Sequence, residues 1–570
     1  MSSTEPSPSA PEAPWGRDLL VLAVVFGVLL GWKLGGAPLA NPDEGRYAEV
    51  PREMVASGDW VTPRLDGVPY FEKPPLVYWA VAACERFLGP SEWSLRLAPA
   101  ALALGGILCA YAAGRRIYGR DAGIWAAVVL GTSLLYLALS RLLILDMAVS
   151  VLMAATLFCF ILAIREPPGW RRRTLFYGLY ASAALATLTK GFIGFLVTGA
   201  VMFLWLLVFR QWRRLRPLHL PTGLLLFVAI ALPWHILVAR RNPGWTHFYI
   251  VYEHLQRYTE TGHGRTGQFW YFVPVVLLGL FPWTGYLWDA ARDALRGGWV
   301  RREENAEAWF FALWAAFIFL FFSASQSKLI PYILPVFPPM AVLIGRWLAR
   351  VVPAPDGFER MRLGLRVFGF LSGLLAAALC VMVLKPGLIR DPQAAAALRP
   401  YAYIMAGVLA LGGIRGLIPR GAGAERGRGA ATAQTVTLVF LFGLLAIARP
   451  AVQLAVKPGT EDLAKVARGV LRPGDQVFHY HNYFQDFPYY AGRTVGLVSY
   501  KDELELQFLD PAEREARFIG DAEFRRAWDG PGRVFAVARI RDTGALFADP
   551  AFHYHLLGVS PDHYLFSNQP

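Results

Sequence analysis

Ionisable side chains that could do chemistry gather in residues 41–79, directly after an apolar run long enough to be a membrane span. Asp43 stands at the end of that run, where a carboxylate is partly desolvated and held close to the lipid headgroups. Glu72 and Lys73 lie among aromatic residues and before Pro74-Pro75, which fixes the backbone and starts the next helix. We therefore expect the Lys73 ammonium close to the bilayer surface, where a cation suits a lipid phosphate.

The first part of this stretch has the spacing of a short helix lying along the membrane surface. Arg46, Glu49 and Glu53 are three and four residues apart, so they share a face on which ion pairs can form. The simplest interpretation of Glu49, Arg52 and Glu53 is a solvated amphipathic connector. Asp43 is not explained in this way.

A further charge lies in the segment "SRLLILDMAV", near the outer end of another apolar run. Asp146 is costly at this position unless it is paired or functional. Arg141 is a plausible partner, and a purely structural Asp–Arg pair explains the charge as well as a functional one does.

Two more segments carry polar residues on the same predicted side of the membrane. "YEHLQRY" places His254 and Arg257 three residues apart, and "SKLIPYILPVFPP" places Lys328 and Tyr332 four apart, so each pair shares a helix face. Taken singly, Lys328 suits a snorkelling lysine and Tyr332 an interface anchor. Together, the segments bring acids, bases and tyrosines from distant parts of the chain to one membrane face.

This combination fits catalysis on a lipid-linked anionic substrate. Lys, Arg and Tyr side chains hold a phosphate that departs as the leaving group and stabilise the charge that builds on it. A carboxylate deprotonates an acceptor or orients it against the sugar carbon. No nucleotide-binding loop is present in the sequence, so an activated sugar is expected to be carried by a lipid.

Composition places the chain among polytopic α-helical membrane proteins. It has 570 residues, 55% of them hydrophobic, and apolar runs recur along most of its length. The net charge of +14 lies mainly in short loops, so it indicates topology and not nucleic-acid binding. The four cysteines lie in apolar runs without a CxxC pair, which argues against a disulfide framework or a cysteine zinc site.

Apolar runs predict about thirteen spans. Arg-rich loops alternate with loops that carry the candidate residues, so the positive-inside rule places the Arg-rich loops in the cytoplasm and the candidate residues in the periplasm. The first run is expected to be retained as a helix, after a disordered cytoplasmic tail at 1–18. The spans are expected near 19–38, 91–113, 121–140, 144–164, 174–188, 191–209, 221–239, 269–290, 308–323, 329–350, 362–384, 399–418 and 432–449.

The character of the chain changes after about residue 455. "GDQVFHYH", "RTVGLVSY" and "GRVFAVAR" predict short strands, "NYFQDFPYYAG" predicts a helix, and the polar segment 501–530 is expected to be helical. We therefore divide the chain into the tail, a transmembrane catalytic domain at 19–450 with outer loops at 40–90 and 240–268, and an α/β domain at 455–570.

Residues 41–79 resemble the first periplasmic loop of the bacterial aminoarabinose transferases that modify lipid A, a family within the protein O-mannosyltransferase-like group of GT-C glycosyltransferases. "EHLQRY" and "SKLIPYILPVFPP" are similar to two further motifs of that family. The resemblance implies a GT-C fold, that is, an all-α polytopic membrane domain of about 13 helices with a small periplasmic α/β domain. It also implies the bacterial inner membrane as location.

For function, the resemblance implies transfer of 4-amino-4-deoxy-L-arabinose from undecaprenyl phosphate to lipid A phosphates by a monomer, which lowers the negative charge that polymyxins exploit. Asp43 resembles the essential carboxylate, and a Glu72–His254 pair resembles a metal contact, which suggests zinc. No other cofactor is expected. The residues that resemble substrate contacts are Arg46, Tyr47, Tyr70, Glu72, Lys73, Asp146, Arg257, Lys328 and Tyr332.

The role of Asp43 depends on the acceptor. A lipid A phosphate is already an anion at neutral pH, so Asp43 would position groups or pair with a cation such as the amine of the donor sugar. If the acceptor is a hydroxyl, Asp43 is a natural general base.

Three other hypotheses compete with this one. A related GT-C transferase would move another lipid-linked sugar to a glycan, lipid or protein. A transporter or flippase would place charges along a pathway at the membrane midplane, with inverted repeats, and neither is evident. A structural scaffold would leave the charge cluster unexplained.

Overall fold

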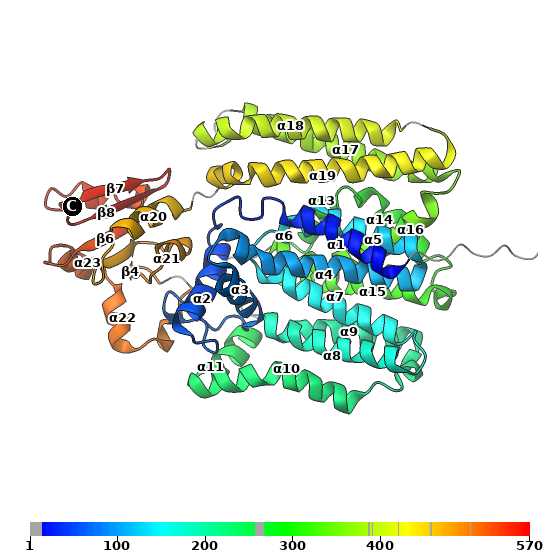
Figure 1. Cartoon of the computed structure of the whole chain (residues 1–570), viewed down its shortest axis with the longest axis horizontal. Coiled ribbons are helices and arrows are strands. Elements are labelled where there is room, and N and C mark those ends of the chain that lie inside the picture. The colour runs from blue at the N-terminus through cyan, green and yellow to red at the C-terminus, as the bar shows by residue number, and fades with distance from the viewer. Residues whose placement is uncertain are drawn as a thin grey trace, which may run out of the picture.

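The computed structural model describes residues 14–256, 267–385, 388–389, 392–419, 421–456, 459–501 and 503–570, with the side chains of 254–256, 392–394 and 453–456 left aside. Most of these residues form a bundle of apolar helices that run along the long axis of the molecule (Figure 1). The bundle helices are α1 (Trp15–Gly31), α4 (Glu92–Tyr118), α5 (Arg120–Thr132), α6 (Leu134–Leu139), α7 (Leu145–Ala163), α8 (Trp170–Lys190), α9 (Ile193–Phe209), α10 (Leu220–Arg241), α13 (Phe272–Gly279), α14 (Leu287–Ala294), α15 (Ala306–Ala324), α16 (Phe337–Val351), α17 (Gly357–Leu384), α18 (Pro392–Leu417) and α19 (Gly423–Val456).

Within the described residues, eight helices are long and apolar enough to cross a membrane, or nine if the bent pair Phe272–Gly279 and Thr284–Ala294 counts as one span. The expected number of thirteen is not confirmed. Four expected spans account for the difference. Helices α1 and α9 have 17 residues each, α5 ends after 13 residues and is separated from α6 by Ser133, and α8 has 21 residues but is less apolar than the eight. Residues 1–13 of the tail predicted at 1–18 lie outside the described residues. Helix α1 begins at Trp15, inside the range predicted for the tail.

A small cap separates the bundle from the C-terminal domain (Figure 1). It contains α2 (Asp43–Ser57), α3 (Leu76–Leu88) and a hairpin of β1 (Arg64–Leu65) and β2 (Val68–Pro69). Asp66 and Gly67 both adopt positive φ at the tip of this hairpin, as a two-residue turn of Asp-Gly type requires.

The cap buries charges that were expected to be solvated. Glu49 is 0% exposed and Glu53 8% exposed, and Arg52 binds the Glu49 carboxylate through two hydrogen bonds of 2.6 and 2.5 Å. Glu53 accepts hydrogen bonds from the Gly67 amide at 3.0 Å. The interpretation of these residues as a solvated connector is therefore wrong, because the C-terminal domain covers the face of α2 that would otherwise meet water.

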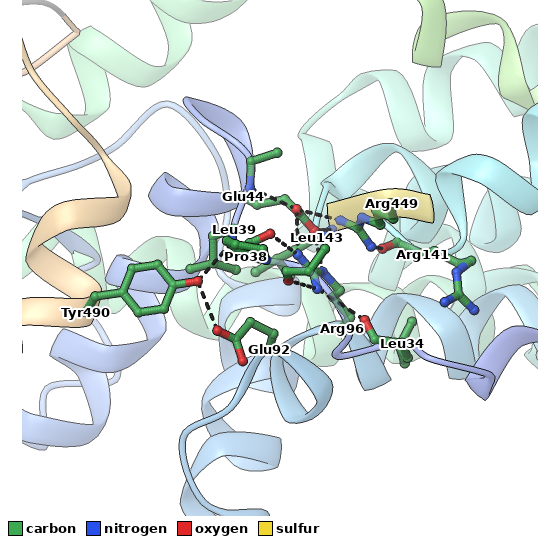
Figure 2. Close-up of polar contacts among 12 residues, drawn as sticks. Leu34, Pro38, Leu39, Glu44, Glu92, Arg96, Arg141, Leu143, Arg449 and Tyr490 are labelled. Atoms are coloured by element: carbon green, nitrogen blue, oxygen red, sulfur yellow. Dashed lines mark hydrogen bonds and ion pairs between the residues drawn. The ribbon is translucent and has the colours of Figure 1, made fainter. Parts of the chain in front are cut away.

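One carboxylate ties the cap to the bundle. Glu44, 1% exposed, accepts hydrogen bonds from Arg96 at 2.8 and 2.9 Å, from Arg449 at 2.8 Å and from the Leu143 amide at 2.9 Å. Figure 2 shows these groups converging from α2, α4, α19 and the segment before α7. Burial by itself raises the pKa of Glu44, but the two guanidinium groups outweigh it and lower the pKa to about 2. We call these four residues the Glu44 cluster.

The C-terminal domain is a six-stranded mixed sheet with strand order β5-β4-β3-β6-β8-β7. Strands β3, β4, β5 and β6 are parallel, whereas β8 pairs antiparallel with both β6 and β7. The three predicted strands and the predicted helix are present. The segment 501–530 contains two helices with a short strand between them, and the two antiparallel strands were not predicted. The elements are α20 (Glu461–Val470), β3 (Gln476–Tyr480), α21 (Asp486–Ala491), β4 (Gly496–Val498), α22 (Pro511–Arg517), β5 (Phe518–Ile519), α23 (Asp521–Trp528), β6 (Val534–Arg539), α24 (Gly544–Phe547), β7 (His555–Val559) and β8 (His563–Ser567).

The sheet buries two imidazoles next to one aromatic ring. His479 on β3 and His563 on β8 both pack against Phe484, with ring centroids 5.0 and 4.8 Å away. The His479 Nδ1 atom accepts a hydrogen bond of 3.2 Å from the Phe484 amide. Burial lowers the pKa of His479 to about 3 and that of His563 to about 4, so both are neutral in the folded domain at pH 7.

The C-terminal domain docks directly on the cap. Asp66 accepts the Val495 amide at 2.7 Å and pairs with Arg517 at 3.0 Å. The Asn41 side chain donates to Asp486 at 2.5 Å. Gly45 allows this approach, because a Cβ atom there would lie 2.5 Å from the Asp486 amide nitrogen.

Replacing Glu44 by Gln should destabilise the protein by about 3–5 kcal/mol, because Arg96 and Arg449 would be left as buried charges without compensation. Thermal unfolding of the purified protein in detergent measures the change. Glu359→Gln is the matched control: this carboxylate on α17 is 59% exposed and pairs only with exposed Arg362, so it should shift stability by less than about 0.5 kcal/mol. Equal melting temperatures for the two variants would contradict the role of the Glu44 cluster.

Acidification should loosen the C-terminal sheet through His479. Its unfolded pKa is about 6.5 and its folded pKa is about 3, so the unfolded state binds more protons between these values and stability falls as pH falls. Between pH 7 and 5 the loss is about 2 kcal/mol. Hydrogen exchange of residues 476–480, corrected for the intrinsic pH effect, checks this. His479→Phe should reduce the acid sensitivity, whereas His555→Gln on the exposed strand β7 should leave it unchanged.

Candidate active site

A cavity of about 570 Å³ opens where the segment before α3, the start of α7 and the end of α8 meet. Its polar end is lined by three carboxylates and two ammonium groups, namely Glu72, Asp146, Glu253, Lys73 and Lys190. Its walls are apolar and come mainly from α7, α9 and α15. The wall residues include Val149, Met153, Ile193, Leu196, Val197, Ala200, Phe317, Phe321 and Phe322.

Lys73 lies between two carboxylates at the polar end. Its ammonium is 3.3 Å from Glu253 and 3.5 Å from the Glu72 carboxylate, and it donates to the Glu72 carbonyl oxygen at 2.8 Å. The double proline after Lys73 precedes α3, as expected. Glu253 comes from the π-helical segment Phe248–Gln256, so this cluster joins the first outer loop to the second.

The second ammonium group, Lys190, lies at the end of α8. It binds Asp146 at 2.5 Å and sits 4.4 Å above the centre of the Tyr332 ring. Asp146 begins α7 and Tyr332 precedes α16, so three parts of the bundle meet at this ion pair.

Arg141, the expected partner of Asp146, lies elsewhere. Its guanidinium donates to the carbonyl oxygens of Leu30 and Trp32 at 2.8 and 2.5 Å and stacks 5.2 Å from the Phe442 ring. It therefore satisfies the carbonyl groups at the end of α1, and the predicted Asp146–Arg141 pair is wrong.

Asp43 and Arg46 occupy the first turn of α2. The Asp43 side chain is 58% exposed and accepts a hydrogen bond from Arg46 at 3.1 Å. Arg46 is 8% exposed and also donates to Glu503 of the C-terminal domain at 2.7 Å. The catalytic carboxylate predicted from the sequence is thus accessible, and a buried guanidinium orients it.

Tyr47 and Tyr70 link this turn to the cavity. Burial raises the pKa of both hydroxyls, and the negative charge of Glu72 raises each further. Both phenols are therefore neutral hydrogen-bond donors at pH 7. Tyr47 belongs to α2 and Tyr70 follows the hairpin, and neither is among the residues that line the cavity.

Lys328 is placed differently from the expectation. It is 5% exposed, and its ammonium donates to the carbonyl oxygens of Ser323 and Ser325 at 2.8 and 2.6 Å, which caps the end of α15. It is not among the residues that line the cavity, and its contact with the substrate stays a prediction.

The remaining predicted residues fall at the edge of the described chain. Arg257 and the side chain of His254 lie outside the described residues. Within the described part, no group of three or more His, Cys, Asp or Glu residues could hold a metal ion. Glu72, the other predicted ligand, already faces the Lys73 ammonium. The described donors alone do not make a zinc site, and the zinc prediction stays a prediction.

Three residues of this region were missing from the predicted site. Lys190 ends an apolar run on the same outer side as Asp146, so the rule that singled out Asp146 also applied to it. Glu253 precedes the His254–Arg257 pair that was identified. Glu503 carries no such signal, because only the docking of the C-terminal domain brings it to Arg46.

The cavity suits an amphiphile with an anionic head. Its ammonium groups are mostly buried and pair with carboxylates. A phosphate that enters the cavity can replace these carboxylates as the partner of the ammonium groups, while the apolar walls accommodate a hydrocarbon chain. Any cationic group next to that phosphate would meet the same carboxylates.

Comparison with known proteins agrees with this geometry. Residues 39–252 match the family model of dolichyl-phosphate-mannose-protein mannosyltransferase, and residues 463–551 match the aminoarabinose transferase C-terminal domain. The undecaprenyl phosphate-alpha-4-amino-4-deoxy-L-arabinose arabinosyl transferase of Pectobacterium carotovorum is 34% identical over 379 residues, which covers 65% of this chain and 67% of that protein. A counterpart in Sodalis glossinidius is 35% identical and covers 66% of each chain. These alignments span about two thirds of the length of the relatives.

The match to solved structures covers more of the chain than the sequence alignments do. The crystal structure of ArnT from Cupriavidus metallidurans bound to undecaprenyl phosphate matches 98% of this chain and 98% of its own, with a TM-score of 0.85 and 28% identity. The apo structure of the same protein matches with a TM-score of 0.83. These matches confirm the resemblance in residues 41–79 and the GT-C fold. The chain belongs to the family of undecaprenyl phosphate-α-4-amino-4-deoxy-L-arabinose arabinosyl transferases.

Proposed function

We propose that this protein transfers 4-amino-4-deoxy-L-arabinose from undecaprenyl phosphate to a phosphate group of lipid A, at the periplasmic face of the inner membrane. The observation that carries the proposal is the cavity, whose polar end holds Lys73 and Lys190 among carboxylates and whose walls are hydrocarbon. A polyprenyl phosphate has the same two parts. Arg-rich loops at the opposite end of the bundle support the periplasmic orientation.

The reaction forms one bond and breaks one. An oxygen of the acceptor phosphate attacks the anomeric carbon of the sugar, and the bond from that carbon to the donor phosphate oxygen breaks. Undecaprenyl phosphate leaves with the bonding electrons, so negative charge builds on the phosphate during the step. Lys73 and Lys190 stabilise this charge in a site where water is scarce, which is worth more than the same contact in bulk water.

The carboxylates of the cavity suit the amino group of the sugar. At neutral pH that group is an ammonium ion, and Glu72, Glu253 and Asp146 surround the place where the donor head would lie. Because the acceptor phosphate is already an anion, Asp43 has no proton to remove from it. Asp43, held by Arg46, therefore positions the reacting groups from the edge of α2.

Asp43→Asn should lower transfer at least about 100-fold while the protein stays folded and membrane-inserted, because the amide cannot hold a cation or keep Arg46 in place. Mass spectrometry of lipid A from cells that lack this protein, complemented with each form, measures the added sugar. Asp121→Asn is the control, since that carboxylate is 72% exposed at the opposite end of the bundle. Normal sugar addition by Asp43→Asn would contradict the assignment, and an unmodified lipid A in wild-type cells would point to another acceptor.

Lys73→Met and Lys190→Met should each weaken binding of undecaprenyl phosphate about 10- to 100-fold, because each removes a charge-assisted contact to the phosphate. Isothermal titration or tryptophan fluorescence on the purified protein measures the affinity. Lys465→Met is the matched control, because this lysine lies on the C-terminal domain and is 60% exposed. An affinity equal to that of the control would show that the lysine does not hold the donor phosphate.

A further inference from the structure

A second cavity, of about 620 Å³, lies on the other side of α9. Its lining comes from α8, α9, α10, α11 (Trp245–His247) and the π-helical segment, and it is almost entirely apolar. Nothing in the reaction described above uses it.

The two cavities share one residue. Phe192, which directly precedes α9, lines both of them. Below it, Ile193, Leu196, Val197 and Ala200 follow the spacing of one helix face and line the first cavity, whereas Phe195 lines the second. Helix α9 is therefore a partition with one apolar groove on each side.

The second cavity also reaches the end of the bundle that contacts the first outer loop. Helix α10 ends at Arg240 and Arg241, and Arg241 pairs with Asp59 of the first outer loop at 3.1 Å. Arg240, which lines the rim of the cavity, is exposed and has no ion-pair partner among the described residues. Trp245 and Tyr249 stack at 4.8 Å in the lining of the same cavity, where both rings are buried.

We propose that this groove holds one acyl chain of the acceptor glycolipid, with Arg240 at the rim facing a phosphate of the same molecule. The proposal rests on the function proposed above, which requires two lipids to meet. In the proposed function, the hydrocarbon chain of the donor occupies the first cavity, between α9 and α15, where the ammonium groups also lie. An acceptor on the α10 side reaches the same polar end past Phe192, and its phosphate has a guanidinium group that no carboxylate in the described part of the chain neutralises.

Leu232→Trp tests the groove by filling it. Leu232 lines the cavity and is 45% exposed, while Leu237 on the same helix is also 45% exposed but does not line it, so Leu237→Trp is the matched control. The full chain is reconstituted with aminoarabinosyl undecaprenyl phosphate as donor. Two acceptors are compared, a fully acylated lipid A and the deacylated glucosamine disaccharide bisphosphate.

With the acylated acceptor, Leu232→Trp should raise KM about tenfold with little change in kcat, because contacts are lost in binding and not in the reacting centre. KM for the deacylated acceptor and the affinity for undecaprenyl phosphate should stay the same. Arg240→Gln should raise KM for both acceptors, since both keep the phosphates. An unchanged KM for the acylated acceptor, or an equal loss with both acceptors, would overturn the proposal.

A binding measurement separates this proposal from the proposed function. Lipid A with a photoreactive group in an acyl chain is crosslinked to the wild-type protein in nanodiscs, and the adducts are mapped by mass spectrometry. Adducts near Phe195 and Leu232 that unlabelled lipid A removes support the groove even if no sugar transfer to lipid A is observed. Competition by undecaprenyl phosphate, or removal of the adducts by phospholipid as efficiently as by lipid A, would assign the groove to the donor chain or to bulk lipid and overturn the proposal.

Discussion

The arrangement of the active site depends on a single buried charge, that of Glu44. Its carboxylate is buried, and its charge is stabilised because Arg96, Arg449 and the amides of Leu143 and Ala40 together satisfy it. The charged partners come from α4 and α19, and the Leu143 amide lies directly before α7. These contacts fix the position and the rotation of helix α2 (Figure 2). Asp43, the residue before Glu44, is fixed with it.

The C-terminal domain completes this arrangement from outside. It supplies Glu503 to Arg46, Asp486 to Asn41 and Arg517 to Asp66, and it covers the acidic face of α2. Helix α2 is thus held between the bundle and the C-terminal domain, and the Asp43 side chain at its start remains 58% exposed. The domain has a structural role in the site although it contributes none of the residues that line the cavity.

The polar end of the cavity combines opposite charges in a way that serves a zwitterionic substrate head. Ammonium groups alone would hold a phosphate but repel an amino sugar, and carboxylates alone would do the reverse. Lys73 pairs with Glu72 and Glu253, and Lys190 pairs with Asp146, which leaves a formal charge of −1 and limits the cost of burying each charge. A donor that carries both charges can replace these internal partners without leaving an unpaired group.

The sequence by itself determined that the chain is a helical membrane protein and that β3, β4 and β6 are strands. It also singled out Asp43, Lys73, Asp146 and Tyr332 as polar residues near the ends of apolar runs. These features follow from neighbouring residues alone, that is, from hydrophobic runs, proline pairs and charges at span ends. Whether Asp146 pairs with Arg141 or with Lys190, and whether Glu49 and Glu53 meet water, depended on which segments pack together. Only the tertiary structure decided these points, because an ion pair is fixed by the distance between side chains that lie far apart in the chain, and sequence spacing carries no measure of that distance.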